Sequence, residues 1–204
     1  VSSFIFGRGN SIYYFLRDAS NIDLLITEGT TLKRGDLCIQ ESEVSRRMAC
    51  VMSAFKYVIV LASATDIERL ASVKTAALKA RKGLYYTGGM MGRAMRIFTH
   101  REAKTSNGLF AFHFKYVGED DPKLGEMQKK GFVLVTGASH LDFVKNMCQG
   151  LSSSEVLLIY SAWDGYYKDP LQVKQHPAYR VFREAFSNVV DIHTSGHASK
   201  ECIT

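Results

Sequence analysis

The stretch YVIVLAS at positions 57–63 decides the fold class of this chain. It is apolar without interruption and rich in β-branched residues, a pattern typical of a strand covered on both faces. Apolar residues recur at helical spacing before it, at 41–55, and again after it, at 66–83. We expect Asp66 to open the second helix and Gly83 to end it. A buried strand between two helices indicates an α/β fold.

The alternation of strands and helices extends along the chain. Further strands are predicted at 21–29, 84–89, 108–117, 131–139, 155–163 and 189–196, and further helices at 90–103, 141–150 and 177–188. The apolar face of the last helix is expected to hold Val181, Phe182, Ala185 and Phe186. Repeated strand–helix units with continuous apolar strands predict a mostly parallel sheet with helices on both faces.

Composition narrows the class of protein. No apolar run in the 204 residues approaches the roughly 18–20 needed to cross a bilayer, and the first residues lack the features of a signal peptide. The cysteines are widely spaced, which favours free thiols in a reducing cytoplasm: Cys38, Cys50, Cys148 and Cys202. The net charge is +6, and basic residues are concentrated at 74–104. This charge permits a polyanionic partner such as nucleic acid, although solvated helix faces would explain it equally well.

The loop HTSGH at 193–197 is the most suggestive candidate for chemistry. It follows a predicted strand, and ligands of parallel sheets bind where the strands end. The imidazoles of His193 and His197 suit acid–base chemistry near neutral pH. The hydroxyl and backbone N–H groups of Thr194, Ser195 and Gly196 could hold a phosphate group. The pattern therefore indicates a catalytic or anion-binding loop, with a purely structural turn as the alternative.

Two other features leave alternatives open. The glycine-rich stretch with Gly88, Gly89 and Gly92 could cradle a nucleotide, but its spacing is not that of the established phosphate-binding loops, and a tight turn explains it as well. Glu28 follows the predicted strand at 21–29. A lone carboxylate at this position is either a turn residue or a functional group that needs a partner.

Three motifs together resemble a known family. IDLLITEGT at 22–30, ESEV at 41–44 and IHTSGHAS at 192–199 are similar to sequences of the β-CASP branch of the metallo-β-lactamase superfamily, which includes ribonuclease J. Glu28 matches the acidic residue of one family motif, and His197 matches the histidine of another. The resemblance covers roughly residues 21–204.

The resemblance implies a division of the chain. Residues 1–35 would be the tail of a metallo-β-lactamase-like domain, residues 36–190 the α/β cap that the family inserts into it, and residues 191–204 the return toward that domain. The family's zinc-binding H-x-H-x-D-H motif does not occur in this sequence. We therefore expect a piece of a longer hydrolase, with two zinc ions in the longer protein, no metal site in this chain and no activity of this chain alone.

The resemblance also implies a mechanism and partners. Glu28 would orient His197, and His197 would protonate the leaving oxygen of a phosphodiester. The phosphate path would be lined by His193, Ser195, Gly196, Thr30 and Ser139. The expected partners are RNA or another nucleic acid and the rest of the metallo-β-lactamase domain, with no membrane and with a homodimer left open. A non-catalytic nucleic-acid-binding module and a nucleotide-binding α/β domain are the alternative functions.

Overall fold

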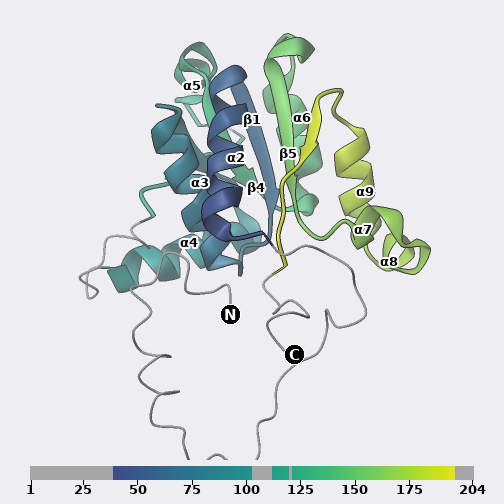
Figure 1. Ribbon diagram of the computed structural model, residues 1–204. Coiled ribbons are helices and arrows are strands. Elements are labelled where there is room, and N and C mark those ends of the chain that lie inside the picture. Colours follow the sequence, from purple (N-terminus) through teal and green to yellow (C-terminus); the bar gives the residue numbers. More distant parts are fainter. Residues whose placement is uncertain (1–38, 103–111, 120, 196–204) are drawn as a thin grey trace, which may run out of the picture.

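A computed structural model describes residues 39–102, 112–119 and 121–195, without the side chains of 99–102. These residues form a six-stranded, all-parallel sheet with helices on both faces (Figure 1). The strands are β1 (Tyr57–Ala62), β2 (Gly83–Tyr86), β3 (Lys115–Tyr116), β4 (Phe132–Thr136), β5 (Val156–Ser161) and β6 (Val189–Asp191). The predicted α/β fold with a mostly parallel sheet is therefore confirmed.

Helices cover the sheet in two layers. One face carries α2 (Glu41–Ala54), α3 (Ile67–Lys79) and α4 (Gly89–Glu102). The other carries α5 (Leu124–Lys130), α6 (Leu141–Cys148), α7 (Gly165–Lys168) and α9 (Pro177–Glu184), with α8 (Pro170–Gln175) packed against α7 and α9. Within the described residues, none of these helices has the length and apolar character that a membrane span requires.

The sheet is built around β1, in the order β3-β2-β4-β1-β5-β6. Ile59 of β1 is in register with Leu134 of β4 and with Leu158 of β5. Val58 and Val60 belong to the core beneath α2 and α3, and Ile59 belongs to the core on the opposite face. Both faces of β1 are thus buried, which explains its uninterrupted apolar sequence.

All six strands end at one edge of the sheet, which we call the carboxyl edge. After β1 the chain runs through α3 toward β2 on one side, whereas after β5 it runs through α7, α8 and α9 toward β6 on the other. Connections that diverge in this way leave a crevice between the two strands, which is where open parallel sheets bind ligands. The fold therefore points to the carboxyl ends of β1 and β5.

Some predicted boundaries need correction. α3 ends at Lys79, before Gly83, because Arg81 adopts a left-handed conformation with φ of 54° and the Lys82 amide bonds back to the Ala77 carbonyl oxygen. Gly83 instead begins β2. Of the strand predicted at 108–117, only Lys115–Tyr116 forms a strand among the described residues, and it lies at the sheet edge. The strand predicted at 21–29 lies outside the described residues.

The apolar face predicted for α9 is only partly correct. Phe182 is fully buried and its ring stacks on Phe186, with centroids 5.6 Å apart. Val181 is 53% exposed, and Ala185 is also exposed. The helix ends at Glu184, so this short element meets the core through a narrow stripe centred on Phe182.

Phe182→Ala and Val181→Ala form a matched pair that tests this arrangement. Removing the buried ring should lower the free energy of unfolding by about 3–5 kcal/mol, because a cavity replaces packed atoms. The change at the exposed neighbour should stay within about 0.5 kcal/mol. Urea unfolding monitored by circular dichroism measures both values, and equal losses for the two variants would contradict the packing described.

Candidate functional site

A buried arginine, Arg69, lies at the carboxyl edge of the sheet, beside the end of β5 and the segment that follows β6. It lies in the first turn of α3, where the side chain of Asp66 caps the helix by accepting a hydrogen bond from the Arg69 amide at 3.0 Å. The Arg69 side chain is completely buried, and burial raises the pKa of the adjacent Asp66 carboxyl group. A guanidinium keeps its charge inside proteins, so its surroundings must satisfy all of its donors.

Every N–H group of the guanidinium has a partner within the protein. Nη2 donates to Glu41 Oε1 at 2.7 Å and to the Thr194 carbonyl oxygen at 3.1 Å. Nη1 donates to Ser161 Oγ at 2.6 Å and to His193 Nδ1 at 3.0 Å. Nε donates to Glu41 Oε1 at 3.1 Å. These partners account for all five donors that a guanidinium offers, so Arg69 has no donor left for a ligand.

The acidic partner of Arg69 is satisfied as well. Glu41 begins α2 and is buried, and the Ser72 hydroxyl donates to its Oε2 at 2.6 Å. A buried ion pair offsets its cost of desolvation only when its geometry is good and its remaining groups are hydrogen-bonded. Both conditions hold here. We call Glu41, Arg69, Ser72, Ser161, His193 and Thr194 the Arg69 network.

The Arg69 network joins two chain segments that are far apart in the sequence. The Thr194 hydroxyl donates to the carbonyl oxygen of Ile39 at 2.7 Å, directly before α2. The Ser161 hydroxyl, at the end of β5, donates to the carbonyl oxygen of Ile192 at 2.7 Å. Ile39, before α2, and Thr194, after β6, therefore meet at a single point of the carboxyl edge.

His193 is held as a neutral ring with a defined tautomer. Because the guanidinium can only donate, His193 Nδ1 must accept, which leaves the ring proton on Nε2. Burial, and after it the charge of Arg69, lowers the pKa of His193 to about 4. At neutral pH the ring therefore offers a hydrogen-bond donor at Nε2 and carries no charge.

The structure brings only some of the predicted site residues together. His193 and Ser195 lie in the segment that follows β6, beside the Arg69 network. Ser139 is exposed after β4, where its hydroxyl and His140 Nδ1 are 3.1 Å apart. In the sheet, β1 and β5 separate β4 from β6, so Ser139 does not join His193. Four predicted site residues lie outside the described residues: Glu28, Thr30, Gly196 and His197.

The glycine-rich loop after β2 has a structural explanation at Gly89. Its φ is +63°, and a Cβ atom there would lie 2.8 Å from Cε1 of the His140 ring. A Cβ atom on Gly92 would make only an ordinary contact, 3.7 Å from the Thr87 carbonyl oxygen, and one on Gly88 would lie 3.8 Å from Tyr116. Gly89 is thus the one of the three whose backbone requires glycine, through its turn and its contact with His140.

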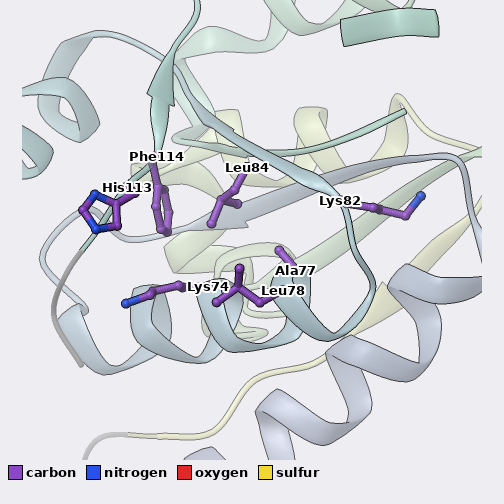
Figure 2. Close-up of a pocket in the computed structure, with 7 residues that line it drawn as sticks. All are labelled: Lys74, Ala77, Leu78, Lys82, Leu84, His113 and Phe114. Atoms are coloured by element: carbon purple, nitrogen blue, oxygen red, sulfur yellow. The ribbon is translucent and has the colours of Figure 1, made fainter. Parts of the chain in front are cut away.

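A separate groove of about 220 Å³ lies between α3 and β2 (Figure 2). Its apolar walls are formed by Ala77, Leu78, Leu84 and Phe114. The basic side chains that line it are Lys74, Lys82 and His113. Figure 2 shows Lys74 and His113 on one side and the amine of Lys82 at the other end. Lys82 Nζ donates to the Lys56 carbonyl oxygen at 3.1 Å, and burial lowers its pKa. None of the predicted site residues lines this groove.

The described residues do not provide a metal site. Across 39–102, 112–119 and 121–195, no group of three or more His, Cys, Asp or Glu side chains is arranged to hold a metal ion. Cys50 and Cys148 are free thiols, and burial raises the pKa of Cys148 to about 11, which makes it a poor metal ligand near neutral pH. These residues therefore do not fit a dizinc centre.

Sequence reasoning missed the core of the Arg69 network, although a signal for it exists. Arg69 stands on the same helical stripe as the buried residues Val73 and Ala76, and Glu41 stands on the same stripe as Met48. A charge on the buried stripe of one helix calls for an opposite charge on another. That rule alone would have paired α2 with α3.

No family model matches the sequence, and no curated protein is significantly similar to it. The resemblance to the β-CASP branch therefore rests on the motif residues themselves, among which Glu28 and His197 are central.

Glu41→Gln and Glu43→Gln, the same change on one helix, test the contribution of the Arg69 network to stability. Glu41→Gln leaves the buried guanidinium without its counter-charge and should lower the free energy of unfolding by about 3–5 kcal/mol. Glu43 pairs with Arg46 and Arg47 on the exposed side of α2, so its replacement should leave stability almost unchanged. Denaturant unfolding measures the free energy of unfolding of both variants. A small loss of stability for Glu41→Gln would show that the buried ion pair is not formed.

The pKa of His193 predicts a pH dependence of stability. The unfolded ring takes up a proton near pH 6.5, whereas the folded ring does so only near pH 4. The unfolded state therefore binds more protons between these values, and stability should fall as the pH drops through this window, by at most about 3 kcal/mol. Above about pH 6.5 this contribution is complete.

Nitrogen NMR of the imidazoles checks the assignment directly. His193 should remain neutral at about pH 5.5 with its proton on Nε2. Titration of His193 near pH 6.5, or a proton on Nδ1, would contradict the contact with Arg69.

Proposed function

We propose that this chain is the substrate-binding cap region of a zinc-dependent phosphodiesterase of the metallo-β-lactamase superfamily, with RNA as the substrate. The observation that carries the proposal is the hydrogen bond between Thr194 and Ile39, which brings the incoming and outgoing chain together at the carboxyl edge. A domain inserted into another needs its two ends close together, because both must return to the host domain.

The positions of the two family motifs support this arrangement. TEGT at 27–30 comes before Ile39, and GHAS at 196–199 follows Thr194 within a few residues. The described residues nearest to the two motifs, Ile39 and Thr194, meet at one point of the carboxyl edge, beside the Arg69 network. This geometry favours a meeting of Glu28 and His197, as the resemblance implies.

The described residues of this region would bind and orient the substrate. The neutral His193 would donate from Nε2 to a phosphate oxygen, and the Arg69 network would hold its ring and the segment up to Ser195 in place. Glu28 would orient His197, and His197 would protonate the leaving oxygen. Because the described residues do not fit a metal centre, we assign zinc to the rest of a longer protein and propose that this chain alone hydrolyses nothing.

Substitutions in the longer protein test the proposal. Glu28→Gln and His197→Ala should each lower the rate of RNA cleavage by roughly 10²–10⁴-fold while leaving RNA affinity nearly unchanged, because they remove acid–base chemistry and not the binding surface. His113→Ala, an exposed histidine away from the Arg69 network, is the matched control and should keep full activity. Cleavage of a labelled oligoribonucleotide is the measurement.

The same experiment separates the catalytic proposal from a non-catalytic binding module. A binding module would bind RNA, and neither Glu28→Gln nor His197→Ala would alter any turnover. A longer protein that binds zinc but cleaves no RNA would refute the phosphodiesterase assignment. Turnover by the 204-residue chain alone would refute the assignment of the metal to the rest of the protein.

A further inference from the structure

Helix α4 has two contrasting faces. Met91 and Met95 point into the core beneath the sheet and are almost completely buried. The opposite face carries four exposed side chains: Met90, Arg93, Arg96 and Ile97. Met90 is 62% exposed and Ile97 57% exposed, so both are far more accessible than apolar residues of a packed helix. No described element of the fold uses this face.

The two arginines on this face differ from those on the other helices. On α2, Arg46 and Arg47 pair with Glu43, and on α9, Arg180 pairs with Glu184. Among the described residues, Arg93 and Arg96 make no ion pair or hydrogen bond with their side chains. Two such guanidinium groups beside exposed apolar side chains form a surface suited to a ligand that is both anionic and rich in flat apolar groups.

An exposed aromatic ring lies next to the start of α4. Tyr116 ends β3, is 55% exposed and packs on Tyr86 with ring centroids 5.7 Å apart. A Cβ atom on Gly88 would lie 3.8 Å from the Tyr116 ring, which places the ring against the loop that leads into α4. A tyrosine supported from behind in this way is a platform on which a base can stack.

We propose that Met90, Arg93, Arg96, Ile97 and Tyr116, which we call the α4 surface, bind a segment of single-stranded RNA. This inference rests on the proposed function and extends it by placing the substrate strand on the cap. The arginines would contact phosphates, Tyr116 would stack on a base, and Met90 and Ile97 would support neighbouring bases. Single-stranded RNA is the occupant because a duplex hides the faces of its bases, which the apolar part of this surface needs.

The α4 surface and the Arg69 network lie at the same carboxyl edge. α4 begins after β2 and His193 follows β6, four strand positions apart in the sheet. With about 4.8 Å between neighbouring strands, the ends of β2 and β6 are roughly 19 Å apart, a span that a few nucleotides can bridge. One RNA strand could therefore contact both sites.

Binding of a fluorescein-labelled oligouridylate of about 12 nucleotides to the 204-residue chain tests the proposal by fluorescence anisotropy. The variant Arg93→Ala with Arg96→Ala should bind at least about 10-fold more weakly, and its dependence on log salt should be shallower by about 1.4, because two phosphate contacts are lost. Tyr116→Leu should weaken binding about 10-fold with an unchanged salt slope, because it removes stacking and no charge.

Lys123→Ala with Lys129→Ala is the matched control. These exposed lysines belong to the α5 region at the opposite edge of the sheet (Figure 1), and the variant loses the same net charge. It should bind almost as tightly as the original chain. The proposal would be overturned if the α4 and α5 variants lost RNA affinity equally, or if Tyr116→Leu bound RNA as tightly as the original chain. It would also be overturned if the original chain did not bind RNA.

Failure of this inference and failure of the proposed function are distinguishable, because anisotropy reports binding and not cleavage. If the chain binds RNA through the α4 surface but the longer protein cleaves no RNA, the binding inference stands and the proposed hydrolase function is refuted. If RNA cleavage depends on Glu28 and His197 but the α4 variant binds RNA normally, the hydrolase function stands and the binding inference is refuted.

Discussion

A single buried guanidinium determines how the ends of this α/β unit are arranged. Arg69 lies on α3 and is fully enclosed, yet all of its donors find acceptors on three other parts of the chain: α2, the end of β5 and the segment after β6. Because a buried charge is costly when any partner is missing, these elements must come together in one arrangement. The hydrophobic sheet provides most of the driving force for folding, and the Arg69 network specifies where the chain comes in and where it leaves.

That arrangement links the fold to the proposed function. The chain crosses the carboxyl edge at Ile39 and at Thr194, and Nδ1 of the neutral His193 is held against Arg69. The saturated donors of Arg69 argue against a direct role in binding phosphate. Its effect on a substrate would be indirect, through the ring orientation of His193 and the position of the motif that follows. Arg93 and Arg96, which make no side-chain ion pair or hydrogen bond among the described residues, lie elsewhere, on α4, and it is there that we propose a contact with the substrate strand.

Much of the fold is predictable from the sequence because it depends on local pattern. β1, β4 and β5 are buried on both faces, so each reads as a continuous apolar run, and the helices between them show a clear helical period. The sequence pattern does not predict the short helices α7 and α8, because four and six residues are too few to show a helical period. The exposure of Val181 has a related cause, because the eight residues of α9 are too few to distinguish a wide apolar face from a narrow one.

The candidate site is less predictable because it depends on contacts between distant residues. Arg69 and Glu41 stand on the buried stripes of their helices, which indicates that α2 and α3 pair, but only the strand order brings them together with Ser161 and His193. The loop that contains His193 could be selected from its residue types and its position after a strand. Arg69, the partner of His193, could not be selected in this way, because no motif spacing connects residues that lie more than a hundred positions apart.

A crystal structure of a longer protein that contains this chain would test the central claim most directly, through the distance between the Glu28 carboxylate and the His197 imidazole. We predict a hydrogen-bond contact of about 2.6–3.2 Å, formed beside the point where Ile39 and Thr194 meet. If the two side chains instead lay at opposite edges of the sheet while the Arg69 network stayed intact, the nuclease proposal would be contradicted. The buried guanidinium would then have only a structural role.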